Sequence, residues 1–186
     1  MAVILPELRT TRLTLKPAKA ADAEDYIAFE ERCAKLPEAT RFLPRRPSMT
    51  LEDVRTRLAA NEGAFTTQRS LATWFIRSPD DATIVGYAAF VRWNHDASCS
   101  EVAYVIGPHA WGQGLAGEAT AALVRYAFTE LGLHRVEARI DPKNHASIRV
   151  AEKIDFVHEE TLRQNVRVEG GYLDSAVYAR LNPDGT

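Results

Sequence analysis

Residues 99–119, CSEVAYVIGPHAWGQGLAGEA, decide the fold because they join a strand to a helix through a glycine-rich turn. The run 99–106 is typical of a strand, and an amphipathic helical pattern follows over roughly 116–131. Three glycines in the turn allow backbone N–H groups to converge on one concavity, and the helix N-terminus adds partial positive charge: Gly112, Gly114 and Gly117. The segment predicts a diphosphate cradle, although a plain tight turn that needs small residues fits it too.

The same turn spells G-x-G-x-x-G, the dinucleotide-binding pattern, and Glu137 lies near the distance expected for its acidic residue. Strands joined by short turns precede the glycines, whereas a Rossmann unit needs parallel strands with helical crossovers. The chain after Gly117 is too short for a second nucleotide-binding half, and Glu137 sits within a strand on its polar face. No Gly-Lys-Ser/Thr follows the turn, which also excludes an ATP-binding P-loop.

Upstream of this stretch the sequence predicts one strand, two helices and a hairpin of strands. Residues 12–16 alternate as a strand, and a helix from Asp22 presents one apolar face made of Tyr26, Phe29 and Cys33. Residues 36–49 hold three prolines and are expected to form a long loop. Thr50 and Asp53 form a capping box for a second helix, whose apolar side is Leu51, Val54 and Leu58 and whose end is expected at Gly63. Strands follow at 70–77 and 83–93, with a bulge expected at Gly86.

Downstream, the helix buries Ala119, Leu123, Tyr126 and Ala127 and ends at Gly132. A strand follows at 134–140, and Asn144 caps a short helix that reaches about Lys153. Two final strands, at about 156–168 and 172–181, are joined by the turn 169–171. A helix that leaves a meander and returns to a strand implies an α/β protein of the α+β type, with a mixed, mostly antiparallel sheet that is parallel in one place.

Composition excludes several classes of protein. The 186 residues are 46% hydrophobic and 26% charged, with a net charge of −2, so no global basic field would hold a nucleic acid. Cys33 and Cys99 lie far apart, and the five histidines form no ligand pair, so neither a disulfide framework nor a metal site is predicted. No apolar run is long enough to cross a membrane. We expect one domain over residues 1–186, located in the cytoplasm, as a monomer or a homodimer.

The chain resembles the GNAT N-acetyltransferase superfamily, and within it the branch that includes ribosomal-protein-alanine N-acetyltransferases. The resemblance lies in TTRLTLKPA at 10–18, YVIGPHAWGQGLAGEA at 104–119 and LGLHRVEARIDPKNHASIRVAEKIDF at 131–156. In the superfamily the turn reads Gln/Arg-x-x-Gly-x-Gly/Ala, and Trp111, Gly114 and Ala116 occupy the three fixed positions here. The resemblance implies the GNAT fold, with helices on both faces of the sheet and one splayed pair of parallel strands, 99–106 and 134–140.

The resemblance also implies a cosubstrate, acetyl-CoA, and no metal. Its pyrophosphate would lie on the glycine turn and its pantetheine arm between the two splayed strands. The residues expected to contact it are Tyr104, Val105, Ile106, Trp111, Gly112, Gln113, Gly114, Leu115, Ala116, Gly117, Asn144, Ser147 and Lys153. Lys153 would reach a CoA phosphate, although a solvated lysine fits its position equally well.

Glu101 is the candidate general base. It shares a side of its strand with Ala103 and Val105, so partial burial would raise the pKa of this carboxyl toward a range useful for accepting a proton. The corresponding strand of GNAT proteins commonly supplies a glutamate. The alternative is an ordinary exposed polar position on an alternating strand. Backbone N–H groups at Val105 or Ile106 would serve as oxyanion donors if the strand bulges.

Ser147 is the candidate acid or thiolate stabiliser. It lies on the same helical face as Asn144. Many relatives carry a tyrosine where this chain has Ala151, and the resembling branch is often said to use the serine instead. Two alternatives stay open: Ser147 serves only the helix cap, or water protonates the leaving thiolate.

The remaining candidate residues concern the acceptor. Trp74, Trp93 and Tyr87 lie on alternating strands and are expected in the core. A basic loop opposite the turn 163–172 would favour an acceptor that carries a carboxylate or phosphate, unless its arginines are simply solvated: Arg41, Arg45 and Arg46.

These features predict an N-acetyltransferase in which an amine attacks acetyl-CoA directly. The acceptor would be a protein N-terminus or a small-molecule amine. The alternative is a CoA-binding sensor or regulatory module without catalysis, which the absent tyrosine keeps open.

Overall fold

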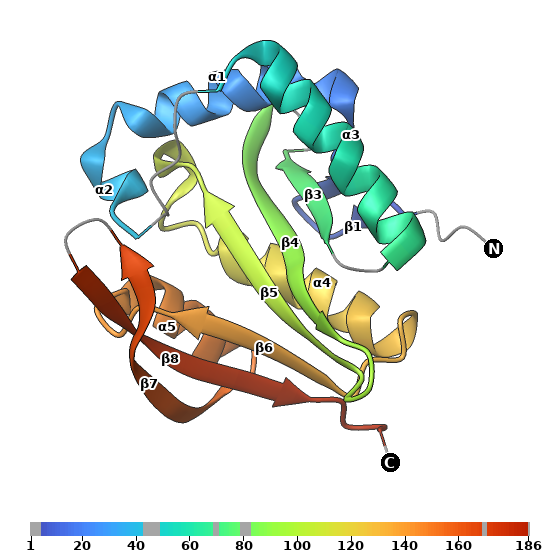
Figure 1. The fold of residues 1–186 in the computed structure, drawn as a ribbon, viewed down its shortest axis with the longest axis vertical. Helices are drawn as coiled ribbons and strands as arrows, with labels where there is room; N and C mark the ends of the chain where they lie inside the picture. Colours follow the sequence, from blue (N-terminus) through green and yellow to red (C-terminus); the bar gives the residue numbers. More distant parts are fainter. Residues whose placement is uncertain (1–4, 43–48, 69–70, 79–82, 169–170, 186) are drawn as a thin grey trace.

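The computed structural model describes residues 5–42, 49–68, 71–78, 83–168 and 171–185. Figure 1 shows one twisted sheet with helices on both faces. Its eight strands are arranged in the order β1-β2-β3-β4-β5-β6-β8-β7. Their bounds are β1 Leu8–Arg9, β2 Thr14–Pro17, β3 Ala72–Arg77, β4 Ile84–Asn94, β5 Cys99–Ile106, β6 Arg135–Ile140, β7 Val157–Val168 and β8 Gly171–Leu181. The mixed, mostly antiparallel sheet predicted from the sequence is thereby confirmed.

The helices also follow the predicted pattern, with two corrections. They are α1 Ala23–Ala34, α2 Pro37–Thr40, α3 Leu51–Gln68, α4 Leu115–Thr129 and α5 His145–Lys153, with short 3₁₀ turns at Ala20–Asp22 and Pro108–Ala110. Part of the expected loop 36–49 is the short helix α2, because Pro37 at its first position suits a helix start. The expected end of α3 at Gly63 is wrong, since the helix continues to Gln68. A glycine inside a helix costs only about 1 kcal/mol and does not by itself end it.

The predicted helix caps are confirmed. The Thr50 N–H donates to Asp53 Oδ2 at 2.9 Å, and the Asp53 N–H donates to Thr50 Oγ1 at 3.2 Å, which is a capping box. The Ser147 N–H donates to Asn144 Oδ1 at 3.1 Å at the start of α5. Gly132, beyond the end of α4, has φ +65°, a conformation that glycine adopts without strain.

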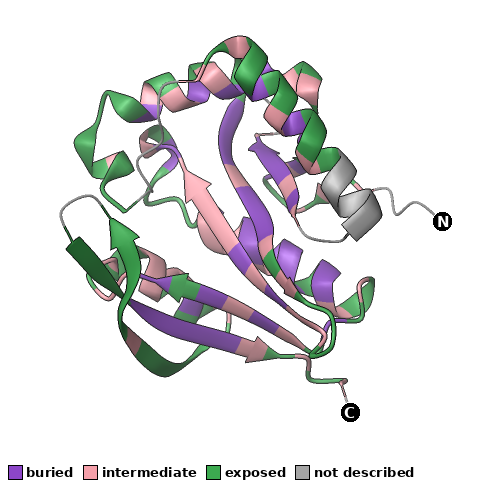
Figure 2. Cartoon of the chain, viewed as in Figure 1, coloured by how far each residue is buried: buried purple, intermediate pink, exposed green. Residues whose placement is uncertain are grey.

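Two hydrophobic clusters lie against the sheet. One packs α4 on the sheet and includes Ala119, Leu123, Tyr126 and Ala127. The other packs α1 and α3 and includes Tyr26, Phe29, Cys33, Val54 and Leu58. Figure 2 shows the buried residues concentrated on the central strands and the inner faces of these helices. The expected core faces of all three helices are confirmed.

The parallel pair β5–β6 is joined at one end only. Its register is Cys99↔Arg135, Ser100↔Val136 and Glu101↔Glu137, and no pairing of the two strands continues beyond Glu101. Figure 1 shows the two strands diverging from this shared end. On their outer sides, β5 pairs with β4 along its length and β6 pairs with β8 from Arg135 to Ile140. The splayed strands predicted at 99–106 and 134–140 are confirmed.

Strand β4 carries two register shifts. One lies beside Gly86, as predicted, because Ile76 pairs with Gly86 while Arg77 pairs with Ile84. The other was not predicted: Phe90 pairs with Val102 and Arg92 with Glu101, so Val91 is an extra residue. An extra residue in one strand changes the side on which the next side chain emerges. The second bulge therefore brings Arg92 to the same side of the sheet as Glu101.

At Gly86, strand β4 lies very close to β5. A Cβ at this position would overlap the Val105 carbonyl oxygen and lie 2.8 Å from Ile106 Cδ1. Because a backbone atom cannot rotate away, β5 itself would have to move.

We therefore predict that Gly86→Ala lowers the free energy of unfolding by about 1–3 kcal/mol, as overpacking does. Gly117→Ala is the matched control, since its Cβ would meet only Ile154 Cγ2 at 3.9 Å and alanine is favoured within a helix. Denaturant unfolding of both variants measures the difference. Equal stability of the two variants would contradict the steric argument.

Candidate active site

The glycine turn lies between the end of β5 and the first residue of α4. Gly112 and Gly114 adopt φ +74° and +76°, in the left-handed region that favours glycine. Gly114 is the N-cap of α4, so the first backbone N–H groups of that helix have no partner within it. A Cβ at Gly112 would meet nothing within 4 Å. The first two glycines are thus required by backbone conformation in this structure, not by lack of space.

Trp111 attaches the turn to the end of β5. Its indole Nε1–H donates to the Ile106 carbonyl at 2.7 Å, while 48% of the residue stays exposed. The ring therefore positions the turn and does not belong to the core.

Hydrogen bonds from the N-terminal segment hold the turn in place, and the sequence did not predict them. Arg12 donates from Nη1 to the Gln113 carbonyl at 2.8 Å and from Nε to Glu118 Oε2 at 2.7 Å. The Thr10 hydroxyl donates to Glu118 Oε1 at 2.6 Å. Burial opposes ionisation of Glu118, but the hydrogen bonds from Thr10 and Arg12 outweigh it and lower the pKa of this carboxyl. The only sequence signal was an acidic residue in the first turn of a helix.

An open cleft of about 1760 Å³ lies along the splayed strands. It is lined from β3 to β6, from α1, α3 and α5, and from the β7–β8 hairpin. Among the residues singled out in the sequence it includes Arg41, Tyr87, Glu101, Ala103, Tyr104, Val105, Asn144 and Ser147. Ile106, the glycine turn and Lys153 do not line it, and Lys153 is exposed near the end of α5.

Glu101 lies in this cleft, at the last position of β5 that pairs with β6. Its side chain is 13% exposed and contacts two arginines, Arg92 Nη1 at 3.1 Å and Arg139 Nε at 3.3 Å. Burial raises the pKa of Glu101, and the two arginines offset part of that rise. The pKa of Glu101 therefore shifts in the direction that partial burial on this side of the strand predicted.

Ser147 is held through its backbone from two directions. Its N–H donates to Asn144 Oδ1, and its carbonyl accepts the Tyr104 hydroxyl at 3.0 Å. Burial raises the pKa of Tyr104 to about 12. Because Tyr104 belongs to β5 and Ser147 to α5, this bond spans the opening between the splayed strands. Ala151, where many relatives carry a tyrosine, is 2% exposed.

The predicted aromatic residues divide between core and cleft. Trp74 is fully buried, and Trp93 packs partly buried against the same cluster. Tyr87 packs against Phe29 and Tyr26, as expected of a residue at the core, and it also lines the cleft. The turn residues 169–170, Arg45 and Arg46 lie outside the described residues.

Other expected features can be placed briefly. Glu137 pairs with Arg135 at 2.9 Å and Arg139 at 3.5 Å, on the polar face of its strand as expected. Within the described part of the chain, no group of three or more His, Cys, Asp or Glu side chains is arranged to hold a metal ion. No helix among those described is long and apolar enough to span a membrane.

Comparison with known proteins agrees with this architecture. The acetyltransferase (GNAT) domain matches residues 12–157. The uncharacterized N-acetyltransferase p20 of Bacillus licheniformis is 27% identical over 175 residues, which cover 94% of this chain and 95% of that protein. The crystal structure of a ribosomal-protein-S5-alanine acetyltransferase from Vibrio fischeri superposes on this chain with a TM-score of 0.88 and 18% sequence identity. The superposition covers 98% of this chain and 100% of that one.

A second solved structure contains coenzyme A. It is a ribosomal L7/L12 alpha-N-protein acetyltransferase in complex with coenzyme A, with a TM-score of 0.85 and 18% identity, covering 95% of this chain and 98% of that one. The two solved structures show the same fold. Since the domain match spans residues 12–157, which is most of the sequence, the chain belongs to the GNAT acetyltransferase family.

Proposed function

We propose that this protein transfers the acetyl group of acetyl-CoA to a primary amine. The observation that carries the proposal is the opening between β5 and β6 beside a glycine turn with free helix N-terminal amides. The relatives named N-acetyltransferases and the CoA complex of a structural neighbour support the same activity.

The cosubstrate would be held by main-chain groups at two places. The amides around Gln113 to Gly117 would bind its pyrophosphate, because helix N-terminal N–H groups attract anions. The contacts of this turn would also include Trp111, Gly112, Leu115 and Ala116, and Lys153 would lie near a phosphate. Beyond Glu101, the inner edge of β5 has no ladder partner on β6, so Tyr104, Val105 and Ile106 can pair with the amides of the pantetheine arm.

Chemistry would take place where Glu101 lies in the cleft. The amine nitrogen attacks the thioester carbonyl, a C–N bond forms, and the C–S bond breaks to release the thiol of CoA. Glu101 would accept the amine proton, directly or through water, and its raised pKa suits that role. Ser147 and Asn144 would lie near the sulfur from the α5 side, and Ser147 would donate a proton to the departing thiolate.

The decisive experiment is an acceptor screen with acetyl-CoA. Amino acids, polyamines, amine antibiotics and peptide N-termini are tested for release of free thiol, and products are checked by mass spectrometry for one added acetyl group. We expect thiol release with at least one amine class. Tight CoA binding without thiol release for any acceptor would instead favour the CoA-binding sensor that the absent tyrosine at Ala151 keeps open.

The cradle is tested by Gly114→Asp. A carboxylate at the turn would repel the pyrophosphate, so we expect the Kd for CoA to rise at least about tenfold. Gly132→Asp is the control, because Gly132 also has positive φ and lies at the opposite end of α4 with nothing within 4 Å of its Cβ position. CoA binding is measured by titration calorimetry. An unchanged Kd for the Gly114→Asp variant would contradict the proposal that the glycine turn binds the pyrophosphate.

The base is tested by Glu101→Gln. We expect kcat to fall by about 10²–10⁴-fold, with the Kd for CoA retained. A base must be deprotonated, so wild-type activity should decline as pH falls through the raised pKa of Glu101, and the variant should lose this acid limb. Arg92→Gln removes a charge that lowers this pKa, so its acid limb should move to higher pH.

Glu137→Gln is the matched control for Glu101. Glu137 pairs with Glu101 across the strands but does not line the cleft. Its variant should keep most of the activity and move the acid limb slightly to lower pH, because Glu137 raises the pKa of Glu101. An identical pH profile for wild type and Glu101→Gln would exclude Glu101 as the base.

A further inference from the structure

The carboxylates that line the cleft all have protein partners. Glu101 pairs with Arg92 and Arg139. Asp141 Oδ1 accepts the Lys143 N–H at 2.8 Å, and Asp174 Oδ1 accepts the Gln164 N–H at 2.9 Å. The acidic side chains of the cleft are therefore engaged in holding the protein itself.

Arg57 on α3 lines the same cleft without such a partner. Its guanidinium lies over the Tyr26 ring, 5.3 Å from the centroid, and Nη1 contacts Met49 Sδ at 3.1 Å. A thioether is a weak acceptor, so most of the five N–H donors of Arg57 have no strong acceptor among the described residues. The carboxylate of Glu30 accepts the hydroxyl of the Tyr26 ring at 2.6 Å.

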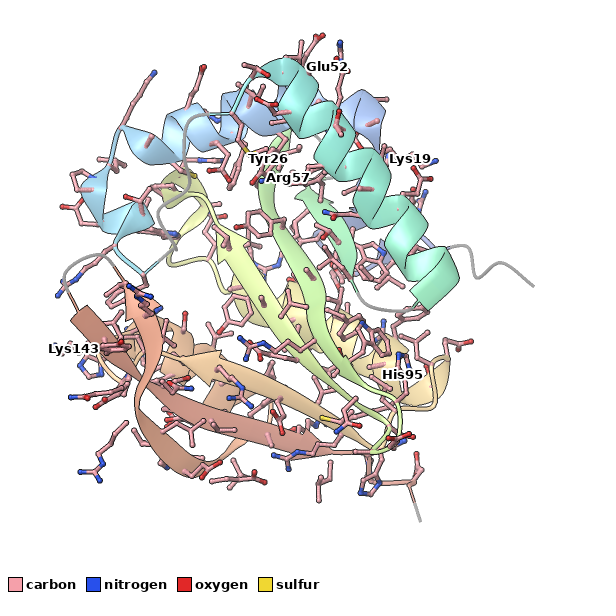
Figure 3. All side chains as sticks on the ribbon, in the orientation of Figure 1. Lys19, Tyr26, Glu52, Arg57, His95 and Lys143 are labelled. Carbon is pink, nitrogen blue, oxygen red and sulfur yellow. The ribbon has the colours of Figure 1, made fainter. Side chains whose placement is uncertain are left out.

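The ring beneath Arg57 is held firmly. Tyr26 is 5% exposed, stacks on Phe75 at 5.3 Å and meets Tyr87 edge-on at 6.1 Å. Figure 3 shows Tyr26 and Arg57 side by side beneath α1 and α3. The guanidinium is thus positioned by packing before any ligand arrives, which reduces the entropy lost on binding.

Arg57 lies on the acceptor side of the sheet. Tyr87 pairs with Val105 on β5, and Val105 shares the side of Glu101. Both Tyr87 and Val105 pack against the cluster of α1 and α3, whereas α4, which carries the glycine turn, packs in the other cluster. A CoA pyrophosphate on that turn would therefore not account for Arg57.

Besides Arg92 and Arg139, which pair with Glu101, two further arginines line the cleft. Arg41 follows α2 and lies over the Phe42 ring at 5.2 Å, and Arg167 belongs to β7. Neither forms an ion pair with another described residue. Together with Arg57 they add positive charge to the cleft, which disfavours an acceptor with several ammonium groups.

We propose that the acceptor is an amine that also carries an anionic group, a carboxylate or phosphate, and that Arg57 binds that group. This inference rests on the proposed function and narrows its substrate class. The planar fork of an arginine matches both anions with two parallel hydrogen bonds. Binding of the anion at Arg57 would orient the amine toward Glu101, across the rings of Tyr26 and Tyr87.

The test compares amines that carry an anionic group with amines that lack one. L-Amino acids are compared with their amides, γ-aminobutyrate with putrescine, and phosphoethanolamine with ethanolamine, by thiol release from acetyl-CoA. We expect kcat/KM to be about 10- to 100-fold higher for the anionic member of at least one pair, mainly through KM. The first two pairs report on a carboxylate and the third on a phosphate. Equal or faster turnover of the amides and diamines would overturn the proposal.

The role of Arg57 is tested by Arg57→Gln, with Arg55→Gln as the matched control. Arg55 lies on the same helix, is exposed, and pairs with Glu24 at 3.0 Å outside the cleft. We expect Arg57→Gln to lower kcat/KM for the anionic member until the preference within the pair is lost, and Arg55→Gln to behave as wild type. Arg57→Lys keeps the charge without the fork and should retain part of the preference. An equal loss for both members of a pair would overturn the assignment.

Equilibrium binding separates this inference from the proposed activity. The same acids and amides are added to the CoA-bound protein, and the shift in thermal unfolding temperature is measured for wild type and Arg57→Gln. A shift with the acids alone that disappears in Arg57→Gln supports the anion site even if no amine releases thiol, in which case only the activity fails. No shift with any acid, together with no preference in turnover, would remove the anion site.

Discussion

The parting of β5 and β6 after three residue pairs is the constraint on which the rest of the structure depends. Both strands are hydrogen-bonded on their outer sides, to β4 and β8, so neither can rotate to recover its inner partners. Beyond Glu101 a row of main-chain groups faces an opening, and such groups need water or a ligand with matching donors and acceptors. The bond from Tyr104 to the Ser147 carbonyl spans this opening and holds its two sides together.

The two faces of the sheet carry different functional groups. On one side, α4 begins at a turn held by Arg12 and Glu118 and directs unpaired amides outward. On the other side, α1 and α3 pack around the rings of Tyr26, Phe75 and Tyr87, and Arg57 of α3 lies over the Tyr26 ring. Glu101 lies where the strands part, accessible from the cleft. In the proposed function this division places the anionic cosubstrate and the anionic group of the acceptor on different sides of the sheet, so the two ligands do not compete for the same cations.

Local sequence signals predicted much of this arrangement. Period-two runs placed the strands, and capping residues such as Thr50 and Asn144 placed helix starts. Strand alternation placed Glu101 on the same side as Ala103 and Val105, and all three line the cleft. These signals succeed because they depend on neighbours within a few residues. The failures have the same cause. Gly63 was expected to end a helix that continues to Gln68, and the bulge at Val91, which depends on pairing with a separate strand, was not predicted.

The sequence by itself therefore determined the order of elements, the splayed strand pair through its family resemblance, the glycine turn and the position of Glu101. Only the tertiary structure decided which distant residues meet. The bulge at Val91 turns Arg92 toward Glu101, Arg12 reaches Gln113 and Glu118 from the N-terminal segment, and Arg57 comes to lie over Tyr26. None of these contacts has a local signature, because each joins residues from separate elements whose approach is set by the packing of helices on a twisted sheet.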